Sequence, residues 1–176
     1  MKHGFVKTAA VTPKIRVADT VYNTEKIILG IEEAAGSGAK IIVFPELCIT
    51  GYTCADLFLQ ELLLRKAEEG LFAIAEHTRE IDALIFVGLP VRRENKLYNV
   101  AAALYRGGIL GFIPKANIPA YGEFYESRHF TEGNREPAVY TVKRGGEEEK
   151  ILFGTNLLFD IECIRGLKVG CEICED

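Results

Sequence analysis

An uninterrupted apolar run, Ile41 to Phe44, constrains the fold of this chain more than any other feature of the sequence. A run of this kind is typical of a strand that is covered on both faces, as in α/β proteins. Pro45 follows at once, and a proline at this point turns the chain out of the strand. The sequence therefore predicts a buried strand whose end carries a carboxylate, Glu46.

Strand and helix patterns alternate on either side of this run. Residues 6–11 are predicted as a first strand, because they are apolar and β-branched and end near Pro13. Apolar residues at helical spacing then predict a helix around residues 27–35, with Asn23 as the candidate N-cap and two glycines, Gly36 and Gly38, at its end.

Residues 56–80 also have helical spacing, with a break expected at Gly70. The second half is dominated by strand patterns, and residues 114–137 between them are predicted to form an ordered loop with a short helix. The predicted strands are 84–89 (stopped by Pro90), 97–104, 109–113, 139–142, 151–153, 157–161 and 167–173. Early alternation followed by hairpins indicates an α/β domain with a mixed sheet.

Length and composition restrict the function classes. The chain has 176 residues, which suits one domain, and is 48% hydrophobic with a net charge of −4. We find no basic stripe for nucleic acid, no signal peptide and no apolar stretch that would span a membrane. We therefore expect a cytoplasmic protein with neither nucleic acid nor membrane as a partner. Its five cysteines, at positions 48, 54, 163, 171 and 174, are expected to stay reduced there.

Three chemically reactive side chains stand at predicted strand ends: Glu46, Lys115 and Cys174. Strand alternation places Leu167, Val169, Cys171 and Ile173 on one face and lets Cys174 emerge on the other, at the end of the strand. Taken singly, the three could be a solvated loop glutamate, a surface lysine and a buried apolar cysteine. Together they make a plausible base, electrophilic stabiliser and nucleophile on one rim of a sheet.

Other candidate ligands and nucleophiles fit less well. Cys171 and Cys174 have the spacing of a zinc knuckle, but no second ligand pair exists to close a tetrahedral site, so no metal is expected. The three histidines show no pattern with cysteine or aspartate and are treated as incidental: His3, His77 and His129. Cys48 and Cys54 flank Gly51 and are interpreted as small packing residues.

At these positions the sequence resembles the nitrilase superfamily of carbon–nitrogen hydrolases, whose triad is Glu, Lys and Cys. Three segments carry the resemblance: residues 44–52, residues 115–121 together with 126–130, and residues 171–176. Within the superfamily, the chain resembles the glutaminase domain that is fused to NAD synthetases. This narrower resemblance is carried by residues 46–58, 118–121, 153–159 and 173–176. Ala120 departs from that pattern, where a polar residue such as Asn is usual. The resemblance implies an α-β-β-α sandwich of mixed sheets with flanking helices, of which residues 1–176 are the N-terminal part.

The same resemblance implies roles for individual residues. Cys174 would attack the side-chain amide of glutamine, with Glu46 as the base. Lys115 and the backbone N–H of Glu175 would stabilise the oxyanion. Glu126 resembles the glutamate that orients the lysine, and Tyr52 and Tyr121 resemble substrate-pocket tyrosines, although either could belong to the core. The carboxylates of Glu175 and Asp176 are expected to point away from the thiol.

The resemblance also implies what lies outside this chain. We expect residues 1–176 to be a C-terminally incomplete hydrolase domain that is inactive by itself and tends to form a homo-oligomer through exposed sheet edges. The ammonia would serve ATP-dependent amidation of deamido-NAD by a synthetase domain that is absent here. No cofactor is expected in residues 1–176, whereas ATP and magnesium are expected for that synthetase domain. The alternative is a standalone amidase that acts on another small amide.

Overall fold

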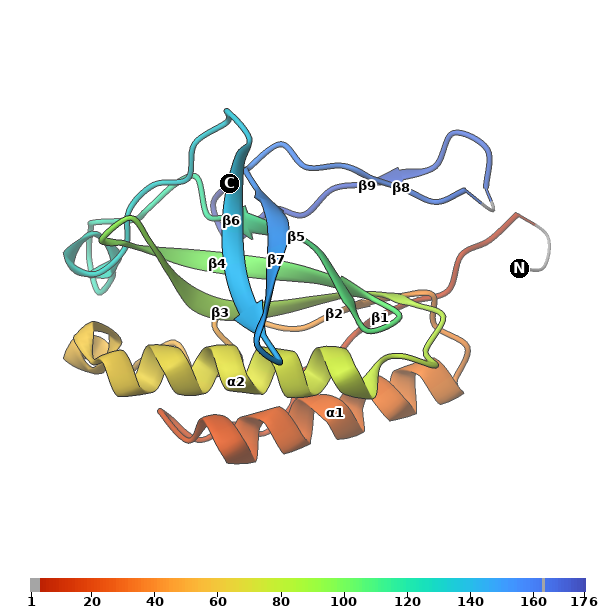
Figure 1. Ribbon diagram of the computed structural model, residues 1–176, viewed down its shortest axis with the longest axis horizontal. Coiled ribbons are helices and arrows are strands. Elements are labelled where there is room, and N and C mark those ends of the chain that lie inside the picture. The colour runs from red at the N-terminus through yellow and green to blue at the C-terminus, as the bar shows by residue number, and fades with distance from the viewer. Residues whose placement is uncertain (1–3, 163) are drawn as a thin grey trace.

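The computed structural model describes residues 4–162 and 164–176; His3 and Cys163 lie outside the described residues. Two helices, α1 (Thr20–Gly36) and α2 (Glu61–His77), lie side by side along one face of a sheet (Figure 1). Two 3-10 turns, η1 (Ala55–Leu59) and η2 (Glu126–Arg128), complete the helical elements, and η2 is the short helix predicted in the loop. The strands of the described residues are β1 (Thr8–Ala10), β2 (Ile41–Val43), β3 (Leu84–Arg93), β4 (Lys96–Tyr105), β5 (Gly108–Pro114), β6 (Ala138–Arg144), β7 (Glu147–Phe153), β8 (Phe159–Asp160) and β9 (Lys168–Val169).

Seven of these strands form one mixed sheet in the order β1-β2-β3-β4-β5-β7-β6, which confirms the α/β class. β1, β2 and β3 are parallel, and β3, β4 and β5 are joined by antiparallel hairpins. The hairpin tips use residues with positive φ, Glu94 with Asn95 and Arg106 with Gly107, as two-residue turns between twisted strands require. The described residues thus supply one helical layer and one large sheet, while β8 and β9 form a separate pair; the full sandwich is not evident in them.

The largest hydrophobic core lies between the helices and the sheet. Its centre consists of fully buried aliphatic side chains, among them Ile27, Ile31, Ile42, Ile74 and Ile85. α2 runs unbroken through Gly70, so the predicted break is wrong. A Cβ at Gly70 would lie 2.5 Å from the Thr24 side-chain oxygen on α1, which means that the glycine allows the helices to approach closely.

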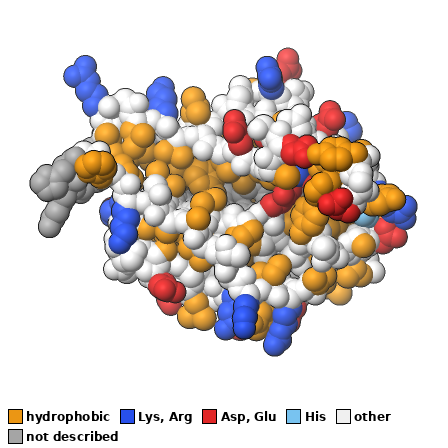
Figure 2. Space-filling view, turned by 180° about the vertical axis from the view of Figure 1, so that it is seen from behind, with side chains coloured by type: hydrophobic (Ala, Val, Ile, Leu, Met, Phe, Trp, Pro, Cys, Tyr) orange, Lys and Arg blue, Asp and Glu red, His pale blue; other side chains and the backbone are white. Residues whose placement is uncertain are grey.

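The opposite face of the sheet is only partly covered. A smaller cluster joins Leu84, Phe86 and Ile113 of the sheet to Phe159 and Val169 beside it. Seen from behind, hydrophobic side chains gather in a broad band across the middle of the molecule (Figure 2). The prediction that β2 is covered on both faces is wrong for the described residues, because Ile42 is buried while Val43 remains 41% exposed.

Two local predictions are corrected because tertiary contacts replace the expected ones. Asp19, not Asn23, caps α1 by accepting a hydrogen bond from the Tyr22 amide. Asn23 is buried inside the helix, and its side-chain amide donates to the carbonyls of Arg16 and Ile49, which ties the helix to the loop after β2.

The second correction concerns Pro90, which does not stop its strand: β3 continues to Arg93. Beyond Phe86, β3 pairs only with β4. The other side of the strand has no partner strand there, so the amide hydrogen that proline lacks is not required.

The predicted strand over residues 167–173 is also shorter in the structure, where β9 ends at Val169. Its side-chain alternation nevertheless extends to Cys174: positions 167, 169, 171 and 173 are buried or half-buried, and positions 168, 170, 172 and 174 are exposed. The expected faces are therefore confirmed, although Cys174 lies in a turn after the strand rather than at its hydrogen-bonded end.

Candidate active site

Glu46 lies in the loop after β2, at the carboxyl end of that strand. This loop is a series of tight turns in which Leu47 is fully buried and has a positive φ of 51°. The carbonyl of Gly88 on β3 accepts a hydrogen bond from the Ile49 amide at 3.2 Å. Gly88 also lies against the loop backbone, since a Cβ at this position would be 2.4 Å from the Leu47 nitrogen and 2.9 Å from the Glu46 carbonyl carbon. The absence of a side chain at Gly88 therefore sets the position of Glu46.

We predict that Gly88→Ala lowers both stability and activity. The added methyl group must push the backbone around Glu46 aside, at a cost of about 1–3 kcal/mol in the free energy of unfolding. A displacement of about 1 Å at a reacting group costs about 100-fold in rate. Gly108→Ala is the matched control, because a Cβ there would meet only the Tyr105 carbonyl at 3.4 Å. Urea unfolding and an assay of the amide hydrolysis that the sequence predicts measure the two effects; a fully active Gly88→Ala protein would contradict this account of the loop.

Lys115 follows β5 and is fully buried, which excludes the surface lysine that sequence reasoning left open. Its Nζ atom donates to Glu46 Oε1 at 2.7 Å and to the two carboxylate oxygens of Glu126 at 2.7 and 2.9 Å. Glu126 begins η2 and is itself only 5% exposed. The structure thus brings Glu46, Lys115 and Glu126 together from three separate segments of the chain.

Opposing effects act on the pKa of Lys115. Burial by itself lowers it, because a desolvated ammonium is disfavoured. The hydrogen bonds and negative charges of Glu126 and Glu46 outweigh burial and raise the pKa above its ordinary value. Lys115 is therefore a cation at neutral pH, suited to stabilise a developing oxyanion.

The segment that carries Cys174 is attached directly beside Lys115. The Asp176 carboxylate accepts hydrogen bonds from the backbone amides of Ala116, Asn117 and Ile173, at 2.9, 2.7 and 3.1 Å. These bonds hold Cys174 in a turn with a positive φ of 57°, an unfavourable backbone conformation that persists only where surrounding contacts impose it. The Cys174 side chain remains exposed.

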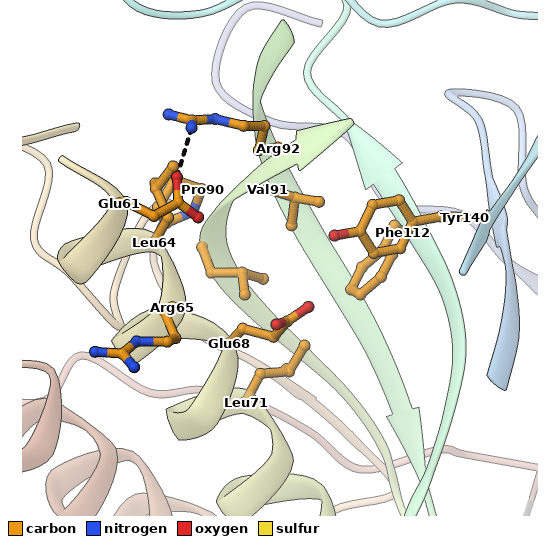
Figure 3. Close-up of a pocket in the computed structure, with 11 residues that line it drawn as sticks. Glu61, Leu64, Arg65, Glu68, Leu71, Pro90, Val91, Arg92, Phe112 and Tyr140 are labelled. Carbon is orange, nitrogen blue, oxygen red and sulfur yellow. Dashed lines mark hydrogen bonds and ion pairs between the residues drawn. The ribbon is translucent and has the colours of Figure 1, made fainter. Parts of the chain in front are cut away.

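Glu46 and Cys174 line the same small cavity, of about 100 Å³, between the loop after β2 and the segment after β9. A larger hollow of about 400 Å³ lies elsewhere, between α2 and strands β3, β5 and β6 (Figure 3). There Glu61 pairs with Arg92, and Glu68 projects among apolar walls. Its described lining contains no cysteine, whereas that of the smaller cavity includes Cys171 and Cys174. The smaller cavity is therefore the better candidate for covalent chemistry.

The two tyrosines expected in a substrate pocket make hydrogen bonds within the site. The Tyr52 hydroxyl donates to Glu126 Oε1 at 2.7 Å, and burial together with this bond raises the pKa of Tyr52. The exposed Tyr121 hydroxyl donates to the Glu175 carboxylate, and that hydrogen bond raises the pKa of Tyr121. The side chains of Glu175 and Asp176 are thus both bonded to other groups. The contacts of the tyrosines with a substrate stay a prediction.

Sequence reasoning missed Asn99 on β4, which is 1% exposed and donates from its side-chain amide to Glu46 Oε1. The one available signal was a polar residue inside an otherwise apolar strand pattern, Leu97 to Leu104. Of the residues set aside, Cys48 and Cys54 are buried packing residues, as predicted. His77 pairs with Glu32, and His129 pairs with Asp56.

The sequence profile of the carbon–nitrogen hydrolase family matches residues 7–176. The chain belongs to this family. Among curated relatives of this carbon–nitrogen hydrolase domain is the glutamine-dependent NAD(+) synthetase of Mycobacterium tuberculosis (strain H37Rv), which is 35% identical over 175 residues. The alignment covers 99% of the chain and 25% of that protein. The chain therefore spans about a quarter of the length of such relatives.

Solved structures agree with this assignment. The crystal structure of a glutamine-dependent NAD(+) synthetase from Cytophaga hutchinsonii superposes with a TM-score of 0.85 at 32% identity, over 97% of this chain and 28% of that one. An amidase from Nesterenkonia sp. superposes with a TM-score of 0.63 at 22% identity, over 85% of this chain and 56% of that one, and shows likeness of fold alone. The mixed sheet and its two helices are thus those of a carbon–nitrogen hydrolase domain. None of the helices in the described residues is long and apolar enough to cross a membrane.

Proposed function

We propose that this carbon–nitrogen hydrolase domain releases ammonia from the side-chain amide of glutamine. The observation that carries the proposal is the buried Lys115, which is bonded to Glu46 and Glu126 beside the turn that holds Cys174. A cation, a carboxylate and a thiol in one place are the groups that amide hydrolysis through a thioester requires. The choice of glutamine follows the relatives that are named for dependence on it.

The first half of the reaction forms a thioester. Cys174 Sγ attacks the amide carbon while its proton passes to Glu46, and the carbonyl oxygen becomes an oxyanion. Lys115 and the Glu175 amide stabilise that charge. As the tetrahedral intermediate collapses, the carbon–nitrogen bond breaks, and Glu46 returns the proton to the departing nitrogen, so that ammonia leaves.

The second half regenerates the enzyme. Glu46 takes a proton from water, whose oxygen attacks the thioester carbon, and Lys115 again stabilises the oxyanion. The carbon–sulfur bond then breaks, the thiolate recovers the proton from Glu46, and glutamate is released. Glu126 keeps Lys115 charged throughout, because it binds the ammonium with both of its oxygens.

The rest of the proposal concerns the protein beyond this chain. We propose that residues 1–176 are part of a longer hydrolase domain, and that the ammonia reaches a synthetase domain that converts deamido-NAD to NAD with ATP and magnesium. This inference rests on the relatives, of which the chain covers about a quarter. Whether the 176 residues alone have activity stays a prediction, as does a homo-oligomeric state.

Measuring ammonia release with different amides tests the proposed substrate. We expect the natural protein, with whatever sequence follows Asp176, to prefer glutamine over propionamide by about 100-fold or more in kcat/KM. A site built to bond polar groups discriminates strongly against an analogue that lacks them. Equal rates with the two amides would instead favour an amidase with another substrate.

A further inference from the structure

Asn99 occupies the centre of the site without belonging to the expected triad. It lies on β4 and is 1% exposed. Its side-chain Nδ2 donates to Glu46 Oε1 at 2.5 Å, and its backbone carbonyl accepts a hydrogen bond from the Lys115 amide at 2.8 Å. One residue of a central strand therefore holds the side chain of Glu46 and the backbone of Lys115.

The bond from Asn99 distinguishes the two oxygens of Glu46. Oε1 accepts from both Asn99 Nδ2 and Lys115 Nζ. Among the residues that the structure describes, none donates a hydrogen bond to Oε2. A carboxylate held by one oxygen cannot rotate freely, so the other oxygen faces a fixed direction. Glu46 lines the small cavity with Cys174 and is 19% exposed, which leaves Oε2 as the oxygen available to a proton.

A packing role does not explain why an amide stands at this position. Asn99 Oδ1 is buried and has no hydrogen-bond partner among the described residues. A buried polar atom without a partner is unfavourable, so an apolar side chain of similar size would stabilise the strand better if packing were the only requirement. The side-chain amide of Asn99 makes one hydrogen bond, from Nδ2 to Glu46 Oε1, and that bond explains why an amide stands here.

We propose that Asn99 is a positioning residue, which fixes Glu46 through Oε1 so that Oε2 takes the proton of the Cys174 thiol. This inference rests on the proposed function, because it assigns Asn99 to the same amide hydrolysis. Asn99 touches neither substrate nor thiol in this scheme; it acts through Glu46. Its loss therefore affects the proton-transfer steps and leaves substrate binding in place.

The test compares N99L with the natural protein in glutamine hydrolysis. We expect kcat to fall about 10- to 100-fold, the loss typical when a hydrogen-bond partner that orients a reactive group is removed, while KM changes less than about threefold. N99D keeps the shape of the side chain but replaces the hydrogen-bond donor by an acceptor, so we expect its kcat to fall by at least the same factor. If N99L does not fold, N99D is the variant that tests the role of Asn99. T24V is the matched control, since Thr24 Oγ1 is also buried without a partner but lies on α1.

A double-mutant cycle separates positioning from a general structural effect. In an E46D background the shortened carboxylate no longer reaches Asn99, so we expect N99L to cost less than about threefold there. The same loss in both backgrounds, or unchanged kcat in N99L and N99D, would overturn the role of Asn99. If the natural protein itself releases no ammonia from glutamine, or if C174S remains active, the proposed function fails instead.

Discussion

Replacing Cys174 by serine is expected to lower glutamine hydrolysis by about 10⁴-fold or more, because the proposed reaction loses its nucleophile. The other described cysteines are not equivalent. Burial raises the pKa of Cys48 to about 12, and burial with nearby carboxylates raises the pKa of Cys171 to about 11. Both are protonated thiols at neutral pH, and a thiol is far less reactive than a thiolate.

Single cysteine substitutions followed by an ammonia assay measure this difference. Cys171→Ser is the most informative control, since Cys171 lines the same cavity three residues earlier and should retain activity close to that of the natural protein. Alkylation with iodoacetamide should likewise abolish activity only when Cys174 is present. Full activity of Cys174→Ser would refute the thioester mechanism.

Lys115→Met is the second change with a large expected effect. Removing the ammonium leaves Glu46 and Glu126 facing each other without a counter-charge, which we expect to cost about 3–5 kcal/mol in the free energy of unfolding. Losing the proposed oxyanion stabiliser should lower kcat about 10²- to 10³-fold. Urea unfolding and the ammonia assay report the two losses.

Lys40→Met is the matched control for this substitution. Lys40 also pairs with a carboxylate, that of Asp82 at 2.6 Å, but both side chains are about half exposed. An exposed pair contributes about 0–1 kcal/mol, so the stability change should be small and the activity unchanged. Equal losses from the two substitutions would show that the burial of Lys115 has no special importance.

The sequence predicted those elements whose signal is local. The hairpin of β4 and β5 is marked by Gly107 and Gly108 between two apolar runs, and both its strands were found where expected. The end of α1 at Gly36 follows from its glycines. The predictions at Gly70 and Pro90 fail for a shared reason, because each depends on a distant element. At Gly70 the close approach of α1 offsets the low helix propensity of glycine. At Pro90 the neighbouring strand β2 has already ended, so the missing amide hydrogen of proline breaks no strand pairing.

In the candidate site too, the residues with a local sequence signal were predicted and the residue defined by a distant contact was not. Strand ends indicated Glu46 and Lys115, and resemblance added Glu126; the structure brings all three into contact. Asn99 gave no comparable signal, since a polar residue in an apolar strand does not reveal which group it will meet. Its partner lies 53 positions earlier in the chain, and only the sheet topology brings the two together.

Those sequence separations have a consequence for how the domain folds. The hydrogen bonds from Asn99 and Lys115 to Glu46 span 53 and 69 positions, and the bond from Tyr52 to Glu126 spans 74. Contacts between distant segments carry a large loop-closure entropy and form slowly. The helices and hairpins can therefore assemble while the three charged side chains are still apart and hydrated. During refolding, the helical circular dichroism signal should therefore return first. Protection of the Lys115 ammonium from solvent exchange, and enzymatic activity, should return later.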